Sequence, residues 1–161
     1  MKVPRLFVAI WICMPLSIGP ALADFATGLQ AFDGGDYQAA LENWQPLADA
    51  GDADAQTAVA GMYLAGAGVP QNYRLAQRWY EAAAEQGQIQ AQLNFGELYA
   101  KGHGISRDPV QAMKWFGLAA ETGHAWAVEA AGDLARSLSR GELDAARHLI
   151  ASWRPKRRNA R

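Results

Sequence analysis

Apolar and small residues recur along the middle of the chain with helical spacing, and the whole pattern repeats after 36 residues. Between Ala53 and Ala65 they fall three or four positions apart, which predicts a helix with one buried face. A second apolar stripe follows after a glycine-rich loop. The shift superimposes Gly51, Gly87 and Gly123, then Ala76 and Ala112, and the aromatic pairs Trp79–Tyr80 and Trp115–Phe116. Such a period is typical of a solenoid built from one repeated helix pair.

The ends of these helices are marked by residue types with a known preference for them. Gly66 follows the first helix, where glycine tolerates the left-handed conformation of a helix C-terminus. Asn72 and its equivalent Asp108 can accept hydrogen bonds from free N–H groups at the start of the second helix, and Pro109 suits its first position. The repeat is therefore a helix, a loop and a second helix.

Partial copies of the unit flank its complete copies. Residues 25–32 and 36–51 predict a shortened first pair, and residues 125–138 and 142–153 predict a divergent last pair. With 161 residues, of which 50% are hydrophobic, the chain is expected to form one packed domain. We therefore predict an all-α solenoid of about four antiparallel helix pairs over residues 24–153.

The repeat unit resembles the Sel-one-like repeat, a relative of the tetratricopeptide repeat. The resemblance is carried by Tyr99-Ala-Lys-Gly-His-Gly-Ile-Ser-Arg-Asp108 and by Ala112-Met-Lys-Trp-Phe116, and it extends from Asp36 to about Asp133. Gly35-Asp36-Tyr37 is more similar to a general tetratricopeptide unit. The resemblance implies an α/α right-handed solenoid that acts as an adaptor, often in exported or envelope proteins of bacteria. It implies no catalytic residues.

The first 23 residues have the pattern of a secretory signal peptide. Two basic residues precede an apolar run from Leu6 to Ile18, and the small residues of Ala21-Leu22-Ala23 follow. We expect cleavage after Ala23 and a periplasmic or secreted mature protein without a transmembrane helix. The only cysteine, Cys13, lies in this segment, so we expect no disulfide in the mature chain.

Charge is unevenly distributed between the predicted domain and the C-terminus. Of 15 basic residues two lie in the signal and five in residues 154–161, which leaves 15−2−5 = 8 against 16 acidic residues. The domain is thus net negative and favours partners with basic patches. The basic tail is expected to be disordered and solvated; alternatively it makes weak contact with anionic membranes or another polyanion, which removal of residues 154–161 would test.

The best candidates for partner binding are residues of the first helices that do not serve the repeat. In such arrays the first helices line the concave surface. Asn94, Glu97 and Lys101 share one side of a helix, and Trp126 stands where other repeats carry a polar residue. Alternatively, Trp126 packs under the terminal helix and the charges are only solvated. The predicted partner-binding residues, expected to contact a protein or peptide, are Asp54, Asn94, Glu97, Lys101, Trp126 and Asp133.

Catalytic and cofactor chemistry has little support in the sequence. His103, His124 and His148 lack the spacing of paired metal ligands, and no Gly-x-Ser-x-Gly motif or phosphate-binding glycine loop is present. We expect no enzyme activity, no metal or cofactor, and no nucleic-acid partner. The alternative is an envelope enzyme acting on cell-wall or β-lactam substrates, which a turnover assay on cell-wall fragments would reveal.

Overall fold

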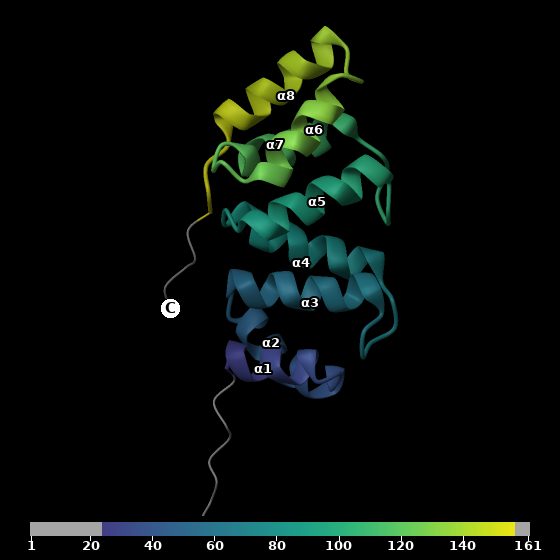
Figure 1. Cartoon of the computed structure of the whole chain (residues 1–161), viewed down its shortest axis with the longest axis vertical. Helices are drawn as coiled ribbons and strands as arrows, with labels where there is room; N and C mark the ends of the chain where they lie inside the picture. Colours follow the sequence, from purple (N-terminus) through teal and green to yellow (C-terminus); the bar gives the residue numbers. More distant parts are fainter. Residues whose placement is uncertain (1–23, 157–161) are drawn as a thin grey trace, which may run out of the picture.

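The computed structural model describes residues 24–156, and all regular structure within that range is helical. The helices are α1 (Phe25–Asp33), α2 (Tyr37–Asp49), α3 (Ala53–Ala65), α4 (Tyr73–Glu85), α5 (Ile89–Lys101), α6 (Pro109–Ala120), α7 (Ala125–Ala135) and α8 (Arg140–Ser152). They stack along one axis, with α1 and α2 at one end and α7 and α8 at the other (Figure 1). The fold is an all-α repeat solenoid, as the sequence pattern predicts.

Capping residues set the helix boundaries of the central repeats. Gly66 and Gly102 close α3 and α5 with φ values of +72° and +76°, a conformation that residues with a Cβ rarely adopt. Asn72 Oδ1 accepts a hydrogen bond from the backbone N–H of Leu75 at 3.1 Å, and Asp108 caps α6 in the same way. These caps define where the first helix of each central repeat ends and where the second begins.

Two buried glutamines at equivalent positions link α3 and α5 to the helix that precedes each of them. Gln56 Nε2 donates to the carbonyl of Ala48 at 3.1 Å, and Gln92 Nε2 donates to the carbonyl of Ala84 at 3.3 Å. Both side chains are buried, where an unpaired amide would cost about 1–3 kcal/mol. The hydrogen bonds therefore specify how successive repeats stack.

Alanines and aromatic rings together fill the space between repeats. Ala76 and Ala83 of α4 are fully buried and allow close helix approach, while Tyr80, Phe95 and Trp115 fill the same cluster with rings. The ring centroids of Phe95 and Trp115 lie 5.3 Å apart, which is a favourable aromatic separation. The predicted alternation of small and aromatic positions is thus the core of the solenoid.

The last repeat departs from its predicted boundaries. Residues 125–138 were expected to form one helix, but α7 ends at Ala135. Just beyond it, the backbone N–H and the hydroxyl of Ser137 both donate to the carbonyl of Leu134, which closes the chain into a turn. The last helix begins at Arg140, two residues before its predicted start at Glu142, because Ser139 and Glu142 form a reciprocal capping box.

Helix α8 packs chiefly on α6, the second helix of the preceding repeat. The contact is close at Gly117, where an added Cβ would clash with Cδ1 of Ile150. The equivalent residue of α4 is Glu81, whose side chain would occupy this position. The absence of a side chain at Gly117 therefore permits the close approach of α8 to α6.

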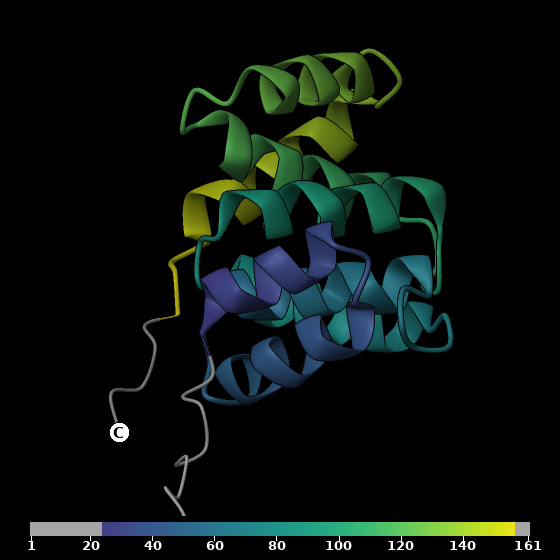
Figure 2. The same cartoon turned by 60° about the horizontal axis from the view of Figure 1, so that its bottom comes forward.

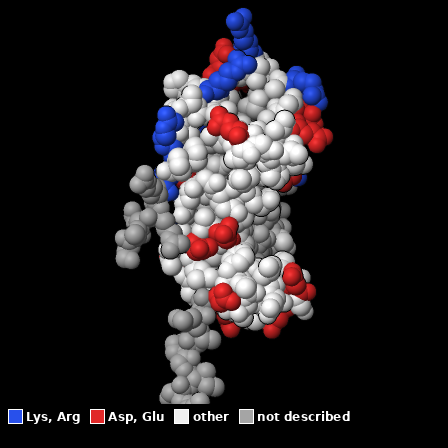
Figure 3. Space-filling view, turned by 60° about the vertical axis from the view of Figure 1, so that its left-hand side comes forward, with Lys and Arg blue, Asp and Glu red and all other residues white. Residues whose placement is uncertain are grey.

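Charged side chains are distributed unequally along the stack. No lysine or arginine occurs between residues 24 and 73, while seven carboxylates do. On the face shown in Figure 3, carboxylates occupy the end of α1–α3, and the basic side chains gather toward α6–α8.

Among residues 24–156, no helix is long and apolar enough to cross a membrane. The predicted signal peptide, residues 1–23, and tail residues 157–161 lie outside the described range.

Candidate functional site

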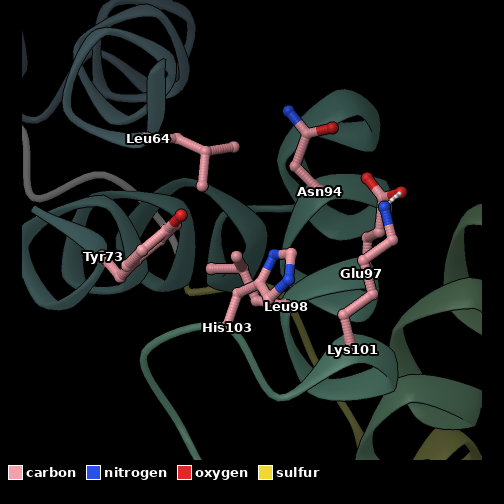
Figure 4. Close-up of a pocket in the computed structure, with 7 residues that line it drawn as sticks. All are labelled: Leu64, Tyr73, Asn94, Glu97, Leu98, Lys101 and His103. Carbon is pink, nitrogen blue, oxygen red and sulfur yellow. Dashed lines mark hydrogen bonds and ion pairs between the residues drawn. The ribbon is translucent and has the colours of Figure 1, made fainter. Parts of the chain in front are cut away.

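A depression of about 180 Å³ opens beside the exposed side of α5. Its lining residues are Leu64, Tyr73, Asn94, Glu97, Leu98, Lys101 and His103. Asn94, Glu97 and Lys101 come from one face of α5, because positions i, i+3 and i+7 align on a helix. Tyr73, Leu64 and His103 come from neighbouring elements and complete the wall (Figure 4).

The loop after α5 brings His103 to this wall. Gly104 has a φ of +75° and lies so close to Tyr73 at the start of α4 that an added Cβ would clash with it. The rings of Tyr73 and His103 consequently stack at a tilt, with centroids 5.6 Å apart. Glycine at position 104 therefore both forms the turn and admits the aromatic wall.

A second depression of about 340 Å³ lies on the α7 side of the same helix. Its lining residues are Gln90, Leu93, Asn94, Glu97, His124 and Trp126. Asn94 and Glu97 belong to both depressions, so the two adjoin across α5. We call this combined surface the α5 groove. It runs from Tyr73 at one end to Trp126 at the other.

Trp126 is both packed and accessible. Its ring stands edge-on to Phe116 with centroids 5.7 Å apart, while 45% of the residue remains exposed. The contact holds the indole in place, and the exposed part lines the groove. A rigid aromatic side chain with free surface is a typical anchor for a binding partner.

The polar groups of the groove remain available for new hydrogen bonds. Lys101 Nζ lies 2.5 Å from Glu97 Oε1, but both side chains are more than a third exposed, so this ion pair adds little stability. Asn94 Oδ1 accepts a hydrogen bond from Gln90 Nε2 at 3.1 Å.

The buried Tyr80 is a neighbour of Asn94. Burial raises the pKa of Tyr80 to about 12, although hydrogen bonding to Asn94 acts in the opposite direction. Tyr80 is thus neutral at physiological pH.

The structure brings four of the six predicted binding residues together and leaves two apart. Asn94, Glu97, Lys101 and Trp126 all line the α5 groove. Asp54 accepts a hydrogen bond from Gln88 at 3.2 Å, and Asp133 pairs with Arg136; neither lines a described depression of the groove.

Sequence reasoning missed Tyr73 and His103 as groove residues. A signal was present, because the 36-residue shift places Tyr37 on Tyr73 and Gly68 on Gly104, and Gly68 lies as close to Tyr37 as Gly104 does to Tyr73. The contact between loop and helix start therefore repeats, but a repeated contact can be recognised only when the distance between the two segments is known.

The groove contains hydrogen-bonding, charged and aromatic groups. In the part of the chain that the structure describes, no group of three or more His, Cys, Asp or Glu residues is placed to hold a metal ion. The amide, carboxylate, ammonium and indole groups that line the α5 groove can form hydrogen bonds, ion pairs and apolar contacts with a ligand.

The stacked helix pairs define a helical-repeat protein. A sequence model described as the Sel1 repeat matches residues 26–52, 53–88 and 89–124, which correspond to the helix pairs α1–α2, α3–α4 and α5–α6. These matches cover more than half of the chain, and the chain belongs to the Sel1 repeat family. Proteins of this family generally mediate protein–protein interaction and are typically non-catalytic.

Solved structures of bacterial repeat proteins resemble the protein, two of them at more than 30% identity. One is a protective antigen present in uropathogenic Escherichia coli strains and displaying an SLR fold, at 31% identity and a TM-score of 0.73 over 76% of this chain and 27% of that one. The other is a Sel1 repeat protein from Oxalobacter formigenes, at 32% identity and a TM-score of 0.66 over 80% of this chain and 54% of that one. The chain thus spans about a quarter and about half of their lengths. No curated protein matches the chain by sequence.

Proposed function

We propose that this protein is a non-enzymatic adaptor that binds a segment of another protein along the α5 groove, the concave face of the solenoid. The observation that carries the proposal is the junction of two depressions at Asn94 and Glu97, with an exposed aromatic anchor at Trp126. Family membership supports the same class of function, because Sel1 repeats generally bind proteins.

The groove chemistry favours an extended peptide. The side-chain amides of Gln90 and Asn94 can donate and accept, as the peptide backbone requires. Trp126 offers apolar surface to one partner side chain, and Glu97 and Lys101 can exchange their mutual ion pair for charges on the partner. Since a surface pair of this kind stabilises the free protein little, breaking it costs little.

We place the adaptor in the bacterial envelope, as an exported protein. The support is the sequence of residues 1–23, with its basic start, apolar centre and small residues before Asp24. The test is N-terminal sequencing of the protein recovered from the periplasmic or secreted fraction. A mature chain that begins at Asp24 is the expected result. An unprocessed chain recovered only from the cytosol would contradict export.

A comparative pull-down tests the binding site. The bait is the chain from residue 24 onward, which contains all the described helices, beside a variant with Asn94→Ala, Glu97→Ala and Trp126→Ala. The matched control carries Gln38→Ala and Glu42→Ala, a hydrogen-bonded polar pair exposed on α2. All three proteins must first show the same helical circular dichroism.

The proposal expects a partner that the parent and the α2 control retain and the groove variant loses. If all three proteins recovered the same amount of partner, the partner would not bind in the α5 groove, and the proposal would be wrong. Saturable hydrolysis of cell-wall fragments or β-lactams by the purified protein would overturn the non-enzymatic function.

A further inference from the structure

Helix α7 lacks the partner that the equivalent helices have. Helix α3 is covered by α4 and α5 by α6, the second helix of the same repeat, whereas α8 packs chiefly on α6. Figure 2 shows α7 along the upper edge of the molecule. The position of a second helix beside α7 is therefore open.

The register of the repeat shows which face of α7 is uncovered. Val128 is equivalent to Gln92 and Gln56, which are 2% and 6% exposed, yet Val128 is 53% exposed. Gly132 is equivalent to the buried Gly96 but is exposed. Val128 and Gly132, with the half-buried Ala131 and Ala135, form a continuous stripe on one side, which we call the open face of α7.

The preceding repeat shows what such a face accommodates. The ring of Phe116 from α6 lies over Gly96, so that an added Cβ would stand 2.7 Å from its Cε1 atom. Around Gly132 the same test finds no atom within 4 Å. The position at which α5 receives the ring of Phe116 is thus unfilled on the open face of α7.

The side of α7 on which another repeat would stack carries charged residues. Glu129 is equivalent to the buried Leu93, and Arg136 is equivalent to the half-buried Ala100; both replacements are exposed and charged. Charged residues of this kind cap a solenoid against further stacking. A second copy or a further repeat is therefore disfavoured, while the position of a single second helix keeps its apolar surface.

We propose that the open face of α7 binds one amphipathic helix of another protein, in the position that α6 occupies on α5. The partner helix carries an aromatic residue flanked by small residues, as Phe116 is flanked by Ala112 and Ala119, with the ring over Gly132. The exposed carboxylate of Glu129 beside this face favours a lysine or arginine on the partner. This surface is separate from the α5 groove, because Val128 and Trp126 point to different sides of α7.

The probe is a fluorescent peptide with the sequence of residues 109–120, flanked by lysines and held helical by a side-chain bridge on its polar face, since so short a helix is unstable alone. Its binding to residues 24–161 is measured by fluorescence anisotropy. Gly132→Leu places a side chain in the proposed ring position, and its Cβ meets no atom within 4 Å. Gly141→Leu is the matched control, because a Cβ added there also has no atom within 4 Å.

We expect saturable binding that Gly132→Leu weakens at least tenfold and Gly141→Leu changes less than twofold. A peptide with alanine in place of the phenylalanine should lose binding as well. Absence of binding to the parent, or equal binding by the Gly132→Leu variant, would overturn the proposal. Concentration-dependent dimers in sedimentation that Gly132→Leu abolishes would assign the face to a second copy and likewise overturn it.

Discussion

The backbone N–H of Lys156 donates a hydrogen bond to the carbonyl oxygen of Glu85 at 2.7 Å, so the segment after α8 returns to the end of α4. The Nζ atom of Lys156 also lies 3.5 Å from Glu85 Oε2. Just before this contact, the ring of Trp153 packs against the central core cluster and lies beside Gly87. Residues 153–156 thus attach the end of α8 to the end of α4, in an earlier repeat.

This attachment should depend on Trp153 far more than on the charge of Lys156. Trp153→Ala removes ring contacts with the core and is expected to lower the free energy of unfolding by about 2–3 kcal/mol, less than a fully buried ring. Lys156→Ala removes an ion pair in which Lys156 is 73% exposed and should cost no more than about 0.5 kcal/mol. Urea unfolding measures both; equal effects would contradict the predicted order.

Gly96 and Gly132 occupy equivalent positions but should respond oppositely to a methyl group. Gly96→Ala places a Cβ 2.7 Å from Phe116 and should destabilise the fold by about 1–3 kcal/mol through overpacking. Gly132→Ala meets no neighbouring atom and should stabilise the fold by about 0.5–1 kcal/mol through helix propensity. The measurement is the urea midpoint of each variant. Destabilisation by both substitutions would show that the face of α7 is covered in solution.

Tyr80 should make stability fall at alkaline pH. Burial raises its pKa from 10.0 to about 12, so above pH 10 the unfolded chain loses this proton before the folded chain does. The folded state therefore loses up to about 2–3 kcal/mol between pH 10 and 12, whereas below pH 10 this group contributes no pH dependence. Unfolding of the parent and of Tyr80→Phe at several pH values measures the effect. An unchanged slope in the variant would contradict it.

The sequence predicts the central repeats well because each boundary depends on local chemistry. The expected first helix, Ala53–Ala65, matches α3, and the same range shifted by 36 residues matches α5, since a glycine closes both helices. The last repeat is harder, because the placement of α8 depends on the contact between Gly117 and Ile150. Helical periodicity does not specify which helix the last one packs against.

The candidate site was also predictable only in part, namely where it depends on the spacing of residues along one helix. Asn94, Glu97 and Lys101 follow from helical spacing on one helix, which the sequence encodes directly. The contribution of Tyr73 and His103 depends on a loop that folds back onto the preceding repeat, and the partial exposure of Trp126 depends on its packing against Phe116. Both relations are contacts between different structural elements, so they can be identified only when the fold is known.

The central claim, that the α5 groove binds a protein partner, is tested most directly by site-specific photo-crosslinking. A photo-reactive phenylalanine analogue is introduced at Asn94 in the groove and, separately, at exposed Gln38 on α2, and extracts of the source organism are irradiated. The account predicts one discrete protein adduct from position 94 and none from position 38. No adduct from position 94, or the same adduct from both positions, would contradict it.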